Sequence, residues 1–84
     1  MDKVCVLILN YRTWRETIRY VTHLRAQRGV DLSVLIVDNC SPNDSYAMLA
    51  GRFRDDPAVA VIQTPRNGGY AYGNNYGLRY LADR

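Results

Sequence analysis

Polar and aromatic side chains that could bind a nucleotide follow three apolar segments of this chain. They are Asn10 and Tyr11 after the first segment, Asp38 and Asn39 after the second, and Asn67 after the third. The Asp38 carboxylate accepts hydrogen bonds, so it suits a base N–H or a ribose hydroxyl. Tyr11 offers a flat apolar face to a base, and the Asn67 amide both donates and accepts. Asp38 has a second interpretation, as the cap of a turn or a helix.

The segment 67–75 is rich in small and polar residues, with three glycines and three asparagines. It matches neither the dinucleotide-binding fingerprint nor a P-loop. Glycines let the backbone approach either a ligand or a neighbouring strand closely. The start of a helix in this segment would favour an anion. Ligand binding and tight packing of a helix on a sheet are therefore both retained as interpretations.

Continuous apolar runs predict buried strands over 4–9, 32–37 and 58–62. Helices are predicted from Trp14 to a stop at Gly29, over 46–53 and over 70–83. Thr13 and Glu16 have the spacing of a capping box at the start of the first helix. Tyr72, Tyr76 and Tyr80 recur every four residues, which predicts a packing face, with a partner or a membrane surface as the alternative.

This order of elements predicts an α/β protein with a three-layer, Rossmann-like βαβαβα fold. Right-handed crossovers give a parallel sheet in the order 3-2-1, with the strand over 4–9 at an edge. Ligands of such sheets bind beyond the carboxyl ends of the strands. The polar and aromatic residues that could bind a nucleotide all follow predicted strands, so we expect them to meet at one site. Asp55 and Asp56 look like a metal-binding pair but precede a strand, so a solvated turn is expected there.

Length and composition exclude several classes of protein. A chain of 84 residues with 48% apolar residues forms one small domain with a packed core. The longest apolar run is strand-sized, so neither a membrane span nor a secretory signal is predicted. The net charge is +3, and the arginines are scattered, which disfavours nucleic-acid binding. Two cysteines at a spacing that fits no zinc site indicate a reducing, cytoplasmic setting.

Four segments, in this order, resemble the N-terminal part of family 2 glycosyltransferases, which have the GT-A fold. The segment 6–11 (VLILNY) resembles the opening strand of that family, and 35–41 (LIVDNCS) resembles its Val-Asp-Asn-x-Ser/Thr turn. The segment 67–70 (NGGY) resembles its Asn-x-Gly-Phe/Tyr motif, and 73–77 (GNNYG) the Asn-x-Gly on the next helix. The resemblance covers nearly the whole chain.

The resemblance implies an enzyme that transfers a sugar from a nucleotide-diphosphate sugar to an acceptor, in the synthesis of a cell-surface polysaccharide. Residues 1–84 would form a single domain, the truncated nucleotide-binding half of a larger one. The implied nucleotide-binding residues are Asn10, Tyr11, Asp38, Asn39, Asn67, Gly69 and Asn75. The family's metal-binding Asp-x-Asp and its catalytic base would follow Arg84, so no catalytic or metal-binding residue is assigned here. The fragment alone is therefore expected to be inactive, although the whole enzyme would use Mn²⁺ or Mg²⁺.

The resemblance also implies a cytoplasmic protein at the inner face of the membrane. The alternative function is a non-catalytic α/β module for interaction or regulation. The apolar strand over 4–9 and the tyrosine face each suit a contact with a second copy, so a homodimer through either is expected.

Overall fold

The computed structural model describes residues 3–27 and 31–83 of the chain. The elements are β1 (Lys3–Asn10), α1 (Trp14–Arg25), β2 (Asp31–Asp38), α2 (Ser45–Arg52), β3 (Val59–Gln63) and α3 (Tyr70–Ala82). The βαβαβα order is confirmed; β1 and β2 extend by one residue at each end of the apolar runs, and β3 is displaced by one residue towards the C-terminus. Gly29, the expected stop of the first helix, lies outside the described residues. In the part of the chain that the structure describes, no helix is long and apolar enough to cross a membrane.

The three strands form one parallel sheet with β2 in the centre. The register pairs Asn10 with Asp38 and Asp38 with Gln63, so the three carboxyl ends lie level. From Val34 to Asp38 every residue of β2 is buried, as expected for a strand with neighbours on both sides. The predicted order 3-2-1, with β1 at an edge, is confirmed.

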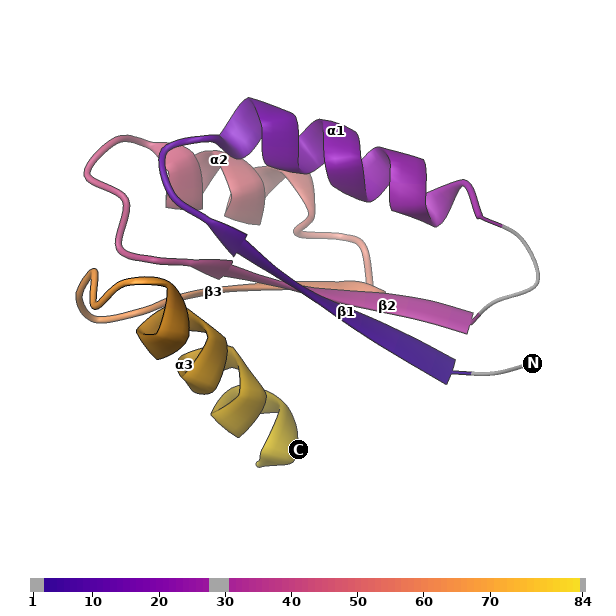
Figure 1. Ribbon diagram of the computed structural model, residues 1–84. Coiled ribbons are helices and arrows are strands. Elements are labelled where there is room, and N and C mark those ends of the chain that lie inside the picture. The colour runs from indigo at the N-terminus through magenta and orange to yellow at the C-terminus, as the bar shows by residue number, and fades with distance from the viewer. Residues whose placement is uncertain (1–2, 28–30, 84) are drawn as a thin grey trace.

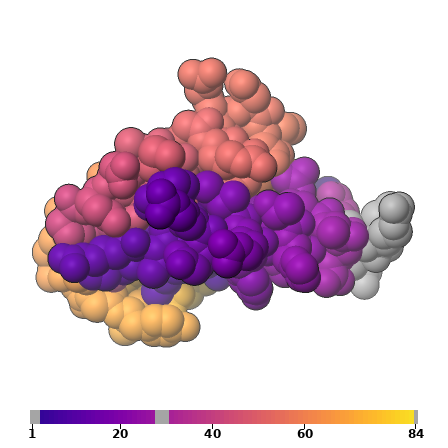
Figure 2. Space-filling model, turned by 90° about the horizontal axis from the view of Figure 1, so that it is seen from above, coloured from indigo at the N-terminus to yellow at the C-terminus, as the bar shows by residue number. Residues whose placement is uncertain are grey.

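The helices lie on both faces of the sheet, which confirms the three-layer arrangement. Helices α1 and α2 cover one face, and α3 covers the other (Figure 1). Seen from above, α1 and α2 hide most of the sheet, and the orange residues of the α3 region emerge at the margin (Figure 2). The loops that follow the three strands gather at one end of the molecule, on the left in Figure 1.

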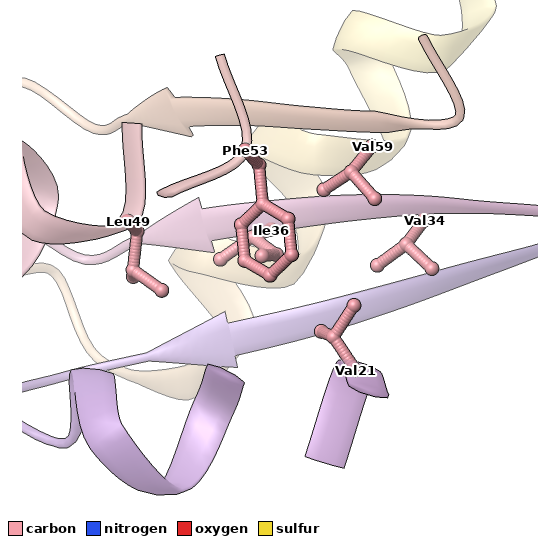
Figure 3. Packing of buried hydrophobic residues seen from close by; sticks show 6 residues of the cluster. All are labelled: Val21, Val34, Ile36, Leu49, Phe53 and Val59. Atoms are coloured by element: carbon pink, nitrogen blue, oxygen red, sulfur yellow. The ribbon is translucent and has the colours of Figure 1, made fainter. Parts of the chain in front are cut away.

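The main hydrophobic core lies between the sheet and the α1–α2 layer. Its buried members are Val21, Val34, Ile36, Leu49, Phe53 and Val59. Their side chains converge from both helices and from two strands (Figure 3). Alternate residues of each strand point to opposite faces, so this core takes the even-numbered residues of β2 and leaves the odd-numbered ones for α3.

Helix α3 approaches the sheet most closely through its glycines. A Cβ atom added at Gly77 would lie 2.7 Å from Leu7 Cδ1 and 2.9 Å from Val37 Cγ2. One added at Gly73 would lie 2.9 Å from Leu9 Cδ2. The interpretation of tight helix–sheet packing is therefore confirmed for Gly73, and Gly77, which lies beyond the segment 67–75, packs in the same way.

The stripe of Tyr72, Tyr76 and Tyr80 flanks this contact instead of forming it. The three tyrosines line a hollow of about 470 Å³ along α3, and Tyr76 is 37% exposed. The tyrosine stripe therefore borders the packing face of α3. The glycines bring the helix backbone against the strands, and Tyr80 lines a further hollow with Leu35 and Ala60 of the sheet.

The predicted capping box at Thr13 and Glu16 is wrong, because it does not form. Thr13 is the N-cap residue of α1 by its position, but no side chain caps the helix there. Its hydroxyl donates instead to Asn10 Oδ1 at 3.3 Å. The Asn10 side chain at the end of β1 takes the Thr13 hydroxyl, so the first turn of α1 has no side-chain cap.

The acidic pair before β3 takes part in ion pairs at the end of the sheet away from the gathered loops. Asp56 pairs with Arg25 at the end of α1 and accepts a hydrogen bond from the Ala58 N–H. The hydrogen bonds from Arg25 and Ala58 hold the pKa of Asp56 below its usual value. Asp55 is highly exposed, and its Oδ1 lies 3.8 Å from Arg54 Nε. The expectation of a turn at this pair agrees with the structure.

Two glycine-to-alanine variants test the close approach of α3. Gly77→Ala should destabilise the chain by about 1–3 kcal/mol, because the new methyl group overlaps Leu7 and Val37. Gly51→Ala, the matched control, should stabilise it by about 0.5–1 kcal/mol, because it lies in α2 with open space around it. Urea unfolding measures both. Equal effects of the two substitutions would contradict the packing described.

The exposed edge of β1 predicts self-association. The strand is almost wholly apolar, and Val4 is 41% exposed. Val4→Lys should raise the dissociation constant of a dimer by about tenfold or more, because a lysine on an edge strand deters pairing. Sedimentation equilibrium measures it. Tyr76→Lys should have little effect, whereas a reversed pattern would move the contact to the tyrosine face.

Candidate functional site

A hollow of about 250 Å³ lies where the strand ends meet the start of α3. Its lining residues are Leu9, Asn10, Tyr11, Asn39, Asn67, Gly69 and Tyr70. Five of the seven residues expected at a nucleotide site are among them, namely Asn10, Tyr11, Asn39, Asn67 and Gly69. These five come from three separate loops, which the parallel sheet brings to one edge.

The other two expected residues, Asp38 and Asn75, do not line this hollow. Asp38 is 0% exposed, at the last position of β2 and next to Asn39. Asn75 is exposed on α3, where it lines the hollow of the tyrosines together with Arg79. Asp38 is thus buried next to the site, behind Asn39, whereas Asn75 lies on a different surface.

The Asp38 carboxylate is the hub of the hydrogen bonds at this edge. Its Oδ1 accepts from Ser41 Oγ at 2.6 Å and from Asn10 Nδ2 at 2.9 Å. Its Oδ2 accepts from the Ser41 N–H at 3.0 Å and from Gln63 Nε2 at 3.1 Å. The bond to the Ser41 N–H makes Asp38 a turn cap, so this second interpretation of the residue agrees with the structure. A buried carboxylate needs such partners, because its desolvation is otherwise very costly.

Asn10 carries the same network into α1. Its side chain is fully buried, and Oδ1 accepts a 2.6 Å hydrogen bond from Thr17 Oγ1. Its Nδ2 donates to Asp38, so both ends of the amide are engaged within the protein. Asn10 therefore orients the loop around the hollow more than it offers polar atoms to a ligand.

A second set of hydrogen bonds fixes the start of α3. Asn39 Nδ2 donates to the Gly69 carbonyl at 3.0 Å, and Asn39 Oδ1 accepts from Thr64 Oγ1 at 3.1 Å. Asn67 Oδ1 accepts from the Gly69 N–H at 3.1 Å. Gly69 has a φ of 90°, a conformation that favours glycine. The loop before α3 is thus held against the end of β2.

Two non-glycine residues at this edge have a positive φ. They are Arg12, at 66°, and Cys40, at 56°. The Arg12 N–H donates to Ser41 Oγ at 2.9 Å, and Asn43 Nδ2 donates to the Arg12 carbonyl at 3.2 Å. These bonds hold an unfavourable backbone conformation in place, a form of local strain that is concentrated at functional sites.

The groups that remain open to a ligand are aromatic and cationic. Tyr11 is 39% exposed and Tyr70 is 77% exposed. The Arg12 guanidinium lies 5.3 Å from the centre of the Tyr11 ring, and the Arg66 guanidinium lies 4.4 Å from that of Tyr72. Flat rings suit a planar base, and guanidinium groups suit an anionic phosphate.

The sequence led to no assigned role for the residues that support the site from behind, which are Thr17, Ser41, Gln63 and Thr64. Thr17 had a detectable signal, because it precedes Val21 by four residues and so shares the buried face of an amphipathic helix. A polar residue at such a position is typical of a buried hydrogen-bond network. Gln63 had no such signal, because its partner lies on another strand.

The residues present do not fit a metal ion. Across residues 3–27 and 31–83, no three or more histidine, cysteine, aspartate or glutamate side chains are grouped so that they could hold one. Asp38 carries a carboxylate at this edge, and both of its oxygens are engaged by donors from the protein.

Comparison with protein-family profiles matches residues 5–83 to Glycosyl transferase family 2. Searches of the curated proteins and of the solved structures gave no significant match. The matched range is essentially the whole chain and includes every loop of the site. Enzymes of that family typically use a divalent metal and a nucleotide-sugar donor.

The hub predicts a large effect of Asp38→Asn on stability. The substitution keeps the shape but turns one acceptor oxygen into a donor that faces other donors, so a loss of about 2–4 kcal/mol is expected. Asp44→Asn is the matched control, because Asp44 is exposed and its side chain caps no helix. It should change stability by no more than about 0.5 kcal/mol. Urea unfolding compares the two, and an Asp38→Asn variant as stable as the control would rule out the hub.

Proposed function

The chain belongs to glycosyl transferase family 2, and we propose that it is the half of such an enzyme that binds the nucleotide of the sugar donor. The observation that carries the proposal is the meeting of five expected contact residues around one hollow at the carboxyl ends of a parallel sheet. In open α/β sheets, this edge is where nucleotides bind.

Each group around the hollow has a role in the proposal. The exposed Tyr11 ring stacks on the base, with the Arg12 guanidinium beside it. Asn67 uses its Oδ1 for the Gly69 N–H, so its N–H₂ group is the part that donates to a ligand. Asp38 accepts from the base or the ribose in place of one of its four protein donors, and Asn10 and Asn39 keep the loops in place.

The size of the hollow supports the binding of part of the donor only. Its volume of about 250 Å³ lies below the roughly 300–1,000 Å³ that is typical of ligand pockets. A nucleoside uses most of such a space, so the diphosphate and the sugar extend beyond it. They reach Asn75 only if the donor runs along α3, and the Asn75→Ala variant tests this part of the proposal separately.

The transfer step itself is assigned to parts other than residues 1–84. Metal-assisted transfer of a sugar needs carboxylates that hold a cation against the diphosphate. Within residues 3–27 and 31–83 no such group of carboxylates or other metal ligands is found, so we propose that the chain alone binds the nucleotide without turning it over. An acceptor in cell-surface polysaccharide synthesis, and a cytoplasmic location at the inner face of a membrane, belong to the same proposal and rest on the family alone.

The proposal predicts weak binding of nucleoside diphosphates. In an NMR titration with UDP, dTDP, GDP, CDP and ADP, at least one should bind with a dissociation constant of about 1 mM, or about 4 kcal/mol. Amide shifts should centre on Tyr11, Asn39 and Asn67, and Asn67→Ala should weaken binding by about 3–10-fold through a lost hydrogen bond.

Incubation of the same chain with nucleotide sugars and Mn²⁺ or Mg²⁺ is expected to give no transfer. Shifts confined to the tyrosine hollow would contradict the assigned site. If none of the five nucleotides binds, the alternative of a non-catalytic interaction or regulatory module is favoured.

A further inference from the structure

The four hydrogen bonds to the Asp38 carboxylate differ in their length and in the exposure of the residues that donate them. Asn10 is 0% exposed and Ser41 is 8% exposed, and together they supply three of the four hydrogen bonds. Gln63 supplies the fourth, at 3.1 Å the longest of the set, from an exposed residue at the end of β3. We propose that Gln63 is a gate, whose side-chain amide holds on Asp38 Oδ2 the place that an N–H of the nucleobase takes when the donor binds. This inference rests on the proposed function.

Gln63 is the donor that a ligand can replace. Withdrawal of Asn10 would break its bond from Thr17 as well, and withdrawal of Ser41 would break its bond from the Arg12 N–H. Gln63 has a long side chain in contact with water, so its amide regains hydrogen bonds as soon as it leaves Asp38. Its backbone stays in place, because the register of β3 with β2 pairs it with Asp38.

The exchange keeps the buried carboxylate satisfied at every stage. One N–H donor leaves Oδ2 and another N–H donor arrives, while the other three hydrogen bonds remain. A ligand without an N–H at that position would leave Oδ2 short of a partner, which is costly for a buried charged group. The gate therefore selects for a base with a suitably placed N–H and against one that carries a methyl group there.

The gate also lies close to the hollow. Asp38 is followed by Asn39, which lines the hollow. The residue after Gln63 is Thr64, whose hydroxyl donates to Asn39. Asn10, which also lines the hollow, donates to Asp38 Oδ1, so the covered carboxylate is one hydrogen bond away from a residue of the hollow's wall.

The experiment compares Gln63→Ala with Gln27→Ala by NMR titration with UDP, dTDP and GDP, whose bases each carry a ring N–H. Gln27 is exposed near the end of α1, away from the site, and so is the matched control. Gln63→Ala should tighten binding by about 3–10-fold, because the nucleotide no longer displaces a hydrogen bond. Gln27→Ala should leave the dissociation constant unchanged.

Two further readouts separate a gate from a residue with a merely structural role. In the unaltered chain, the side-chain N–H₂ resonances of Gln63 should move towards those of a solvated amide as the nucleotide binds. If UDP is the ligand, its 3-methyluridine analogue should bind about tenfold more weakly and gain nothing from Gln63→Ala.

The outcomes are distinct. Nucleotide binding that Gln63→Ala weakens or leaves unchanged would overturn the gate and leave the proposed function standing. The same holds if the Gln63 side-chain resonances stay still on binding. Failure of every nucleotide to bind the unaltered chain would overturn the proposed function and the gate with it.

Discussion

A carboxylate with no access to water organises the functional end of this molecule. The desolvation free energy of an unpaired buried charge is comparable to the whole stability of a small domain, so Asp38 has to be surrounded by hydrogen-bond donors. Those donors come from the ends of β1 and β3 and from the turn after β2. The requirement to satisfy one side chain therefore aligns the strand ends, closes the first two loops against each other and shapes the rim of the hollow.

The two faces of the sheet meet this end in different ways. On one face, α1 and α2 enclose a core of interlocking aliphatic side chains and Phe53. On the other, α3 approaches so closely that Gly73 and Gly77 have no room for a methyl group. The close approach brings the first turn of α3 to the same edge as Asn39, which holds it through the Gly69 carbonyl. One face thus provides stability, and the other places the start of a helix beside the hollow.

The fold could be read from the sequence because its signals are local and repeated. Each apolar run became a strand, and the polar residues after each run met at one edge. The partners of those residues were harder to foresee. Thr13 was expected to cap α1 and bonds to Asn10 instead, because a side-chain acceptor near in space outcompetes the helix backbone. Gln63 and Asp38 lie 25 residues apart, and no periodicity links them. Asn75 was assigned from a motif, which does not specify the surface that a helical residue occupies.

The separation along the chain of the Asp38 donors has a consequence for how the protein forms. Asn10 is 28 residues away and Gln63 is 25 residues away, with a crossover helix inside each interval. Neither bond can form until the corresponding loop has closed, and contacts of this kind are slow to form. This edge of the sheet should therefore be completed late in folding, after the helices and the sheet have assembled. A ligand that recognises this edge binds the native state alone, and so raises the free energy of unfolding.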